Sequence, residues 1–341
     1  MSLIATLPDV PLDIVGDIHG EIDALESLIH HLGYQDDGRH PENRKLVFIG
    51  DFIDRGPDSP QVLRRIQQWV ANGNAFAILG NHEINLLAND AKDGSGWYFP
   101  QQYPIDQKRY RYQMMEETEK SALVDFLNTL PIALERKDLR IIHALWQPEK
   151  IQQLRLLEEN ITPQQAYFHF EKLRKEAIRL ESWFEQYQQE HHYYHHHCRI
   201  ETEPMPMMES IAKRDLFCND FNPLRSLTCG TENFAKKPFF AAGRWRMTTR
   251  TAWWNDYQET TPVIIGHYWR QWQPKTPQAL FPEPPNAWLG AKKNVFCVDY
   301  SVGARWRIRE KPSLHQPYRL AALRFPERIL IFDDGEMAET I

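Results

Sequence analysis

Leu12-Asp13-Ile14-Val15-Gly16-Asp17-Ile18-His19-Gly20 is the stretch of the chain that decides the fold. Its first four residues form a short, mostly apolar run, which predicts a buried strand that ends at the first glycine. Apolar residues at helical spacing follow over 22–32, and Gly33 predicts the end of that helix. The stretch therefore predicts a strand and a helix joined by a tight loop that carries two polar side chains.

The same alternation continues toward the C-terminus. Residues 45–49 and 75–79 predict two more strands, and residues 59–73 predict the helix between them. We expect Ser59 to be the N-cap of that helix, with Pro60 at the first helical position. Alternating strands and helices predict a mostly parallel sheet, in which active sites gather at the carboxyl ends of the strands.

The middle of the chain has a different pattern. Residues 121–130 predict a helix and 139–142 a strand. Thr162 with Gln165 resembles a capping box, which predicts a helix running to about residue 190. We interpret residues 150–260 as a largely helical insertion over the active edge of the sheet.

Strand patterns return late in the chain, and we expect them to form a second sheet packed against the first. The four runs are Val263–Ile265, Val295–Val298, Tyr318–Arg324 and Arg328–Phe332. The last two are separated by a short turn that predicts a hairpin. The fold expected is α/β (α+β), a single domain over residues 1–341.

Composition limits the class of protein. The chain has 341 residues with 42% hydrophobic and 25% charged residues, which is typical of a globular protein. Its formal charge of −6 gives no overall reason to bind nucleic acid or an anionic membrane. The 4 cysteines form no paired motif, so we expect free thiols, and no signal peptide or membrane span is predicted. We therefore expect a cytoplasmic protein.

Metal-type ligands recur where predicted strands end. The segments are Gly16-Asp17-Ile18-His19-Gly20, Gly50-Asp51-Phe52-Ile53-Asp54-Arg55-Gly56, Gly80-Asn81-His82-Glu83, Ile142-His143-Ala144 and Gly266-His267-Tyr268-Trp269-Arg270. In all but the fourth, a glycine allows the backbone to turn sharply. Carboxylate, amide and imidazole groups without thiolates are typical of a site for manganese, iron or zinc.

The first three segments, GDIHG, GDFIDRG and GNHE, resemble the signature of calcineurin-like metallophosphoesterases. The likeness is to bacterial members of the phosphoprotein-phosphatase branch, and His143 and Gly266-His267 are similar to the two remaining histidine motifs. The resemblance implies a four-layer sandwich, in which two mixed β-sheets are flanked by helices.

The resemblance also implies two divalent metal ions, with manganese as our first choice and iron or zinc as alternatives. Asp17, His19 and Asp51 would hold one ion. Asp51 would bridge to the second ion, which the family pattern assigns to Asn81, His143 and His267. In the family mechanism, a hydroxide that bridges both ions attacks phosphorus.

Further roles follow from the same resemblance. His82 is similar to the family's general acid, Asp54 to the residue that orients it, and Arg55 to a phosphate-binding arginine. Arg250 is our choice for a second phosphate-binding arginine because it lies just upstream of a Trp-Trp pair, and Arg270 is the alternative.

Two departures concern the substrate. Leu79 stands where eukaryotic protein phosphatases have arginine, and Ala144-Leu145-Trp146 replaces their glycines. We therefore expect a metal-dependent phosphoesterase that hydrolyses a phosphomonoester or phosphoanhydride of a phosphorylated small molecule or nucleotide. The alternatives are a symmetrical dinucleoside-tetraphosphate hydrolase, a Ser/Thr protein phosphatase acting on a phosphoprotein, a nuclease or cyclic phosphodiesterase, and a non-catalytic scaffold. The intact set of site residues disfavours the scaffold.

Overall fold

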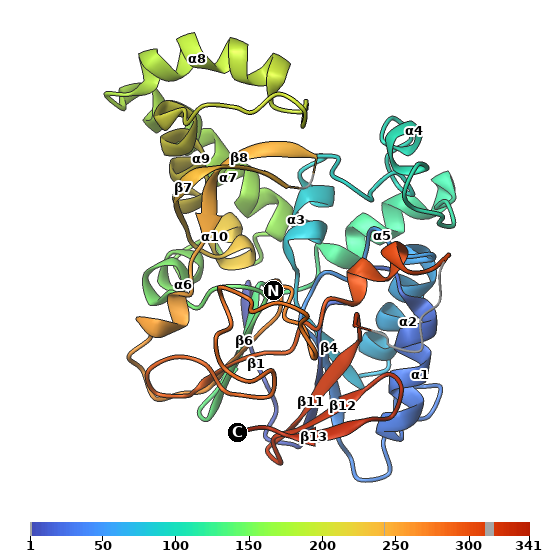
Figure 1. The fold of residues 1–341 in the computed structure, drawn as a ribbon. Helices are drawn as coiled ribbons and strands as arrows, with labels where there is room; N and C mark the ends of the chain where they lie inside the picture. Colours follow the sequence, from blue (N-terminus) through green and yellow to red (C-terminus); the bar gives the residue numbers. More distant parts are fainter. Residues whose placement is uncertain (1, 242, 311–316) are drawn as a thin grey trace.

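The computed structural model describes residues 2–241, 243–310 and 317–341. Two mixed sheets lie face to face between helices, which is the four-layer arrangement expected (Figure 1). The six-stranded sheet has the order β13-β12-β11-β2-β3-β4, formed by Met337–Glu339 (β13), Ile329–Phe332 (β12), Ala321–Phe325 (β11), Leu12–Val15 (β2), Lys45–Phe48 (β3) and Ala75–Ala77 (β4). The five-stranded sheet has the order β1-β5-β6-β9-β10, formed by Ile4–Thr6 (β1), Ala133–Arg136 (β5), Leu139–Ile142 (β6), Val263–Ile265 (β9) and Val295–Cys297 (β10).

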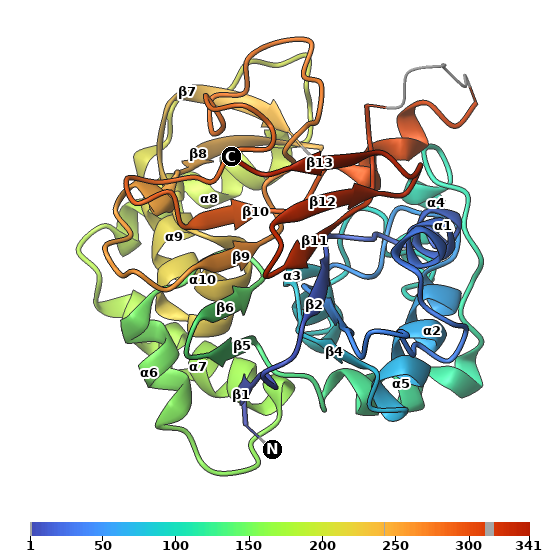
Figure 2. The same cartoon turned by 90° about the horizontal axis from the view of Figure 1, so that it is seen from below.

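Helices cover the outer faces of both sheets. Figure 2 shows α1, α2 and α5 beside the six-stranded sheet and α6 and α10 beside the five-stranded sheet. The α-helices are Ile22–Leu32 (α1), Ser59–Ala71 (α2), Asn81–Leu87 (α3), Tyr103–Asp106 (α4), Lys120–Leu127 (α5), Pro148–Arg155 (α6), Pro163–Ala177 (α7), Phe184–His197 (α8), Glu209–Phe221 (α9) and Pro223–Cys229 (α10). The 3-10 helices of the described residues are Glu117–Glu119 (η1), Ile178–Leu180 (η2), Trp253–Asn255 (η3) and Val302–Arg307 (η4). None of the helices in the described ranges is long and apolar enough to cross a membrane.

The alternation of side chains along the central strands explains the layering. Leu12 and Ile14 of β2 belong to the apolar cluster between the two sheets, together with side chains of β3, β6 and β9. Val15 and Phe48 belong to the other large cluster, which joins the outer face of the sheet to α1 and α2. Because both faces are covered, these strands are apolar over nearly their whole length.

The order of strands differs from the sequence-based prediction in one respect. β2, β3 and β4 are parallel, as expected. The hairpin β11–β12 does not join the second sheet, because β11 pairs antiparallel with β2 and so extends the first sheet. Only β9 and β10 of the late strands lie in the second sheet.

The prediction for the start of α2 was wrong by one residue. Asp58 is the N-cap, and its carboxylate accepts a hydrogen bond from the backbone N–H of Gln61 at 2.8 Å. Ser59 lies inside the helix, and its hydroxyl oxygen accepts from the backbone N–H of Asp54 at 2.9 Å. The serine therefore fixes the loop before the helix.

The region 150–260 contains more than the helices expected. The capping box of Thr162 and Gln165 is present, but the helix that follows breaks after η2, where Glu181 has an extended backbone. The break lets Trp183 contact Phe217 of α9. Two strands that the sequence did not predict, Glu232–Ala241 (β7) and Arg244–Arg250 (β8), form an antiparallel hairpin. We propose that α6–α10 and this hairpin are the insertion, and Figure 1 shows α8, α9 and the hairpin on one side of the sheets.

Candidate metal centre

The five polar segments meet where strands of both sheets end. Asp17 follows β2, Asp51 follows β3 and Asn81 opens α3, while His143 and His267 follow β6 and β9 of the other sheet. The backbone turns sharply at these points. His19, Asp51 and His267 have positive φ values of 50°, 50° and 70°, although none is glycine. Such conformations are unfavourable for residues with a side chain and gather at functional sites.

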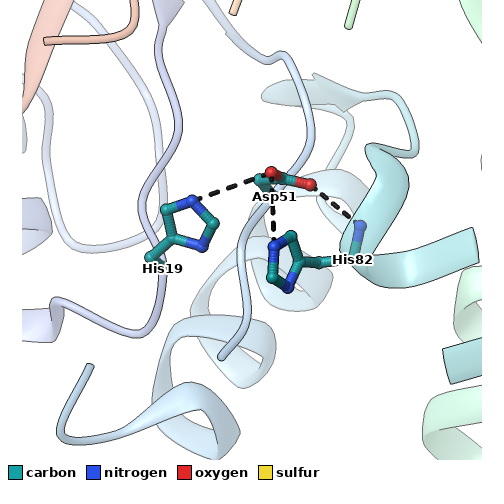
Figure 3. Close-up of side chains that lie close together, drawn as sticks. All are labelled: His19, Asp51 and His82. Carbon is teal, nitrogen blue, oxygen red and sulfur yellow. Dashed lines mark hydrogen bonds and ion pairs between the residues drawn. The ribbon is translucent and has the colours of Figure 1, made fainter. Parts of the chain in front are cut away.

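Asp51 lies at the centre of the cluster. Figure 3 shows the rings of His19 and His82 approaching the same oxygen of its carboxylate. Its Oδ2 is 3.7 Å from His19 Nε2 and 4.0 Å from His82 Nε2. Its Oδ1 is 3.4 Å from His143 Nε2, in the direction of the second sheet. The two oxygens of one carboxylate therefore face two different groups of ligands.

Backbone carbonyls fix the orientation of two histidines. Nδ1 of His19 donates to the carbonyl oxygen of Ile53 at 3.0 Å, and Nδ1 of His143 donates to that of Ile49 at 2.8 Å. A carbonyl can only accept, so each ring carries a proton on Nδ1 and turns Nε2 toward Asp51. Such hydrogen bonds set the tautomer of metal-binding histidines.

The expected ligands cluster around Asp51, but the group of His19 contains His82 where Asp17 was expected. The ligand atoms of Asp51, His143 and His267 are within 4.8 Å of one another, and so are those of His19, Asp51 and His82. Asn81 joins the first of these groups, because its Oδ1 is 2.8 Å from His267 Nδ1. Asp17 lies next to His267, whose backbone N–H its carboxylate accepts at 3.1 and 3.2 Å.

Burial disfavours the charged forms of these side chains unless an opposite charge lies nearby. Burial and the neighbouring carboxylate of Asp299 raise the pKa of Asp17 well above its usual value. Burial and Arg55 lower the pKa of His19 well below its usual value. Burial also opposes charge on His143, but the attraction of Asp51 outweighs it and raises the pKa of His143 to about 10. A cation between Asp51 and His143 would compete with that proton, as metals do at histidine ligands.

Glu83 holds the loop of Asp51 in place, a role that the sequence did not indicate. This fully buried carboxylate accepts the backbone N–H groups of Asp51 at 2.8 Å, Phe52 at 2.8 Å and Gly80 at 2.9 Å. Burial and the nearby charge of Asp51 raise the pKa of Glu83 to about 7. Glu83 is the last residue of the GNHE segment, two residues after Asn81, so the sequence showed its place in the motif but not its hydrogen bonds.

A second chain of hydrogen bonds orients His82. Its Nδ1 is 2.5 Å from Asp54 Oδ2, and the other oxygen of Asp54 accepts the indole N–H of Trp97 at 2.6 Å. His82 Nε2 faces the centre, where it accepts a hydrogen bond from Nη2 of Arg55 at 3.0 Å. The sequence predicted the pairing of His82 with Asp54, whereas nothing in it indicated Trp97.

The arginines differ in their access to the centre. The Arg55 guanidinium lies 2.8 Å from His19 Nε2 and stacks over the ring of Trp269 at 4.9 Å. Arg250 donates to the backbone carbonyl of His267 at 3.0 Å and lines the same cleft as Arg55. Arg270, the alternative to Arg250, is fully buried and donates to the carbonyls of Pro284 and Ala287. Arg270 is therefore not available to a phosphate group.

One further carboxylate had a signal in the sequence that we did not use. Asp299 follows β10, as Asp51 follows β3, and it is buried near Asp17. Its two oxygens accept the backbone N–H groups of Trp269 at 2.6 Å and Ser301 at 2.8 Å. Asp299 thus fixes the loops beside His267 and His19.

The residues present fit a pair of divalent cations. Imidazole nitrogens point their lone pairs inward, oxygen ligands complete each group, and Asp51 belongs to both groups. This is the mixed nitrogen and oxygen chemistry of manganese, iron and zinc sites. The fold and this site together define a metallophosphoesterase-type architecture.

The chain belongs to the calcineurin-like phosphoesterase family, whose sequence profile matches residues 10–202. The resemblance predicted from the motifs is therefore confirmed.

Relatives of known description match shorter segments. The asymmetrical bis(5'-nucleosyl)-tetraphosphatase PrpE of Oceanobacillus iheyensis is 46% identical over 140 residues, which cover 39% of this chain and 54% of that protein. The symmetrical bis(5'-nucleosyl)-tetraphosphatase of Ralstonia nicotianae is 30% identical over 41% of this chain and 43% of that protein. Serine/threonine-protein phosphatase 2 of Escherichia coli is 41% identical over a segment that covers 25% of this chain and 35% of that protein. The matches span about half or less of the relatives' own length.

A solved structure covers more of the chain at lower identity. The cold-active protein-tyrosine phosphatase of a psychrophilic Shewanella species matches 99% of this chain and 82% of its own, with 17% identity and a TM-score of 0.45.

We predict that Glu83→Gln weakens both the fold and the metal centre. The amide keeps one acceptor oxygen but turns an NH₂ group toward a backbone N–H, leaving buried donors without partners. The expected loss is about 2 kcal/mol in the free energy of unfolding, measured with urea. Isothermal titration with Mn²⁺ should show weaker binding. Unchanged stability together with unchanged metal affinity would contradict the role of Glu83.

Proposed function

We propose that the protein is a two-metal phosphoesterase that hydrolyses a phosphomonoester or a phosphoanhydride. The observation that carries this proposal is the pair of ligand groups that share Asp51. Membership of the calcineurin-like phosphoesterase family supports it. The tetraphosphatases and the protein phosphatase among the relatives make a phosphorylated substrate the natural choice.

The metal assignment is part of the proposal. By the family resemblance, Asp17, His19 and Asp51 would hold one ion. Asp51 would also contact the second ion, held by Asn81, His143 and His267. Manganese is our first choice. When bound, two such cations supply positive charge to the phosphoryl oxygens and lower the pKa of a water molecule.

The other side chains have separate tasks. Arg55, supported by Trp269, would bind the phosphoryl oxygens, with Arg250 on the neighbouring wall of the cleft. His82 would donate the proton on Nε2 to the leaving oxygen, while Asp54 holds Nδ1 and so fixes the ring. Because His82 also lies within a possible ligand group with His19 and Asp51, its role needs a test that separates acid catalysis from metal binding.

Nucleotide phosphoanhydrides are the favoured substrates within this class. Two of the relatives are named as bis(5'-nucleosyl)-tetraphosphatases. The cleft beside Arg55 also contains more arginines than one phosphoryl group requires. The cytoplasmic location expected from the sequence stays a prediction.

Turnover by metal-loaded protein tests the proposal. We expect protein stripped with EDTA to be inactive, and protein reconstituted with Mn²⁺ to hydrolyse p-nitrophenyl phosphate and diadenosine tetraphosphate. A panel with a phosphoserine peptide and a cyclic nucleotide distinguishes the alternative substrates. If protein loaded with Mn²⁺, Fe²⁺ or Zn²⁺ hydrolyses no substrate of the panel, the proposed phosphoesterase function is rejected.

We predict that His82→Ala loses activity according to the leaving group. Without a proton donor, the rate on a phosphate ester whose alcohol has a high pKa should fall by about 10²–10⁴-fold, and the rate on p-nitrophenyl phosphate should fall less. Metal content, measured by inductively coupled plasma spectrometry, should remain at the wild-type level. Loss of one ion, or an equal loss of rate on both substrates, would show that His82 is not the general acid.

A further inference from the structure

A large cleft of about 770 Å³ opens beside the metal centre. Arg55 and Trp269 form its inner end, next to His19. Most of the other lining residues come from three parts of the chain: the segment 93–110, the hairpin β7–β8, and η4. The cleft therefore extends well beyond the position of one phosphoryl group.

The walls of the cleft carry an excess of positive charge. Five arginines line it: Arg55, Arg109, Arg246, Arg250 and Arg307. Only two carboxylates line the cleft with them: Asp93 pairs with Arg109 at 3.5 Å, and Glu232 accepts the hydroxyl of Thr248 at 2.5 Å, so positive charge remains in excess among the lining residues. In a chain of net charge −6, this concentration of cations forms a local binding site for a polyanion.

The arginines fall into two sets. Arg55 and Arg250 contact residues of the metal centre and suit the phosphoryl group that reacts. Arg246 and Arg307 line the cleft as well, from β8 and η4. Burial and the neighbouring Arg244 lower the pKa of Arg246, so a bound anion would relieve repulsion there.

An aromatic corner lies at the side of the cleft formed by η4. The rings of Tyr110 and Trp306 meet edge to face, with centroids 5.3 Å apart. The hydroxyl of Tyr110 is held by Asp93, whereas Trp306 is half-buried and its neighbour Arg307 is exposed. The Arg307 guanidinium lies over one face of the Trp306 ring, 5.4 Å from its centroid, so a nucleobase would stack on the other face.

The corner has a fixed position relative to the metal centre. Gly303 of η4 packs against the ring of His19 so closely that a Cβ atom would lie 2.3 Å from its Cδ2. Arg305 of the same helix donates to the carboxylate of Asp333 at 2.5 Å and to the carbonyl of Tyr318 at 2.9 Å. Trp306 is therefore held by the helix that also supports a predicted metal ligand.

Building on the proposed phosphoesterase function, we propose that Trp306 and Tyr110 form a base-stacking subsite, and that Arg246 and Arg307 hold phosphate groups that are not cleaved. The substrate would then be a nucleoside polyphosphate that places its reacting phosphoryl group at Arg55. A phosphopeptide lacks a chain of linked phosphates and would leave these two arginines without anionic partners.

Variants at Trp306 test the stacking subsite. Trp306→Leu keeps an apolar side chain but removes the π face, and Trp306→Phe keeps a smaller ring. With Mn²⁺-loaded protein, we expect Trp306→Leu to lower kcat/KM for diadenosine tetraphosphate about tenfold. Its kcat/KM for inorganic tripolyphosphate, which has linked phosphates and no base, should stay within about twofold of wild type. Trp306→Phe should recover most of the activity on the dinucleotide. Trp183→Leu, at a half-buried tryptophan of the insertion that contacts Phe217 and lies outside the cleft lining, is the matched control and should alter neither rate.

Arg246→Gln tests the phosphate part separately. It should lower kcat/KM for both diadenosine tetraphosphate and tripolyphosphate, and leave p-nitrophenyl phosphate unchanged. Arg39→Gln, at an exposed arginine outside the cleft, is its control.

The outcomes separate the two proposals. If wild-type protein hydrolyses none of these substrates, the phosphoesterase function itself fails. If wild-type protein hydrolyses them, but Trp306→Leu lowers all rates equally or lowers none, the stacking subsite is rejected. The proposed phosphoesterase function then still stands. Faster turnover of a phosphoserine peptide than of any polyphosphate, with no effect of Arg246→Gln, would likewise reject the subsite and favour a protein phosphatase.

Discussion

The structure depends on one buried carboxylate, Asp51, held between two sets of imidazoles. β3 lies between β2 and β4, so the loop after it adjoins the ends of both neighbours and faces the second sheet. Three backbone N–H groups bound to Glu83, and the Nδ1 hydrogen bonds of His19 and His143, fix the groups around it. Gathering these charges away from water is unfavourable unless cations balance them.

The cleft follows from the same arrangement. Because η4 packs on His19 and β8 leads from the cleft to the backbone of His267, both walls are tied to predicted metal ligands. A substrate bound along these walls has its reacting group placed by the elements that place the ligands. In this view the hairpin β7–β8, the segment 93–110 and η4 choose the substrate, while the ends of the strands supply the chemistry.

The sequence predicted the parts of the fold that have strong periodicity and the side chains that follow them. β2, α1, β3 and α2 are buried on a regular face, so their patterns are clear. The hairpin β7–β8 was missed because its strands are partly exposed on both faces, for example at Phe234 and Phe239, and show no simple alternation. Glu83, Trp97 and Trp306 act through contacts with distant segments, which neither composition nor spacing reveals. Arg270 was a plausible alternative in sequence, and only packing shows that it is buried.

Anomalous diffraction from crystals grown with Mn²⁺ tests the central claim most directly. Data collected at the manganese edge should show two peaks, one on each side of the Asp51 carboxylate, with the His19 side and the His143 side each occupied. One peak alone, or peaks that do not contact Asp51, would contradict a bridging carboxylate and with it the two-metal account of this protein.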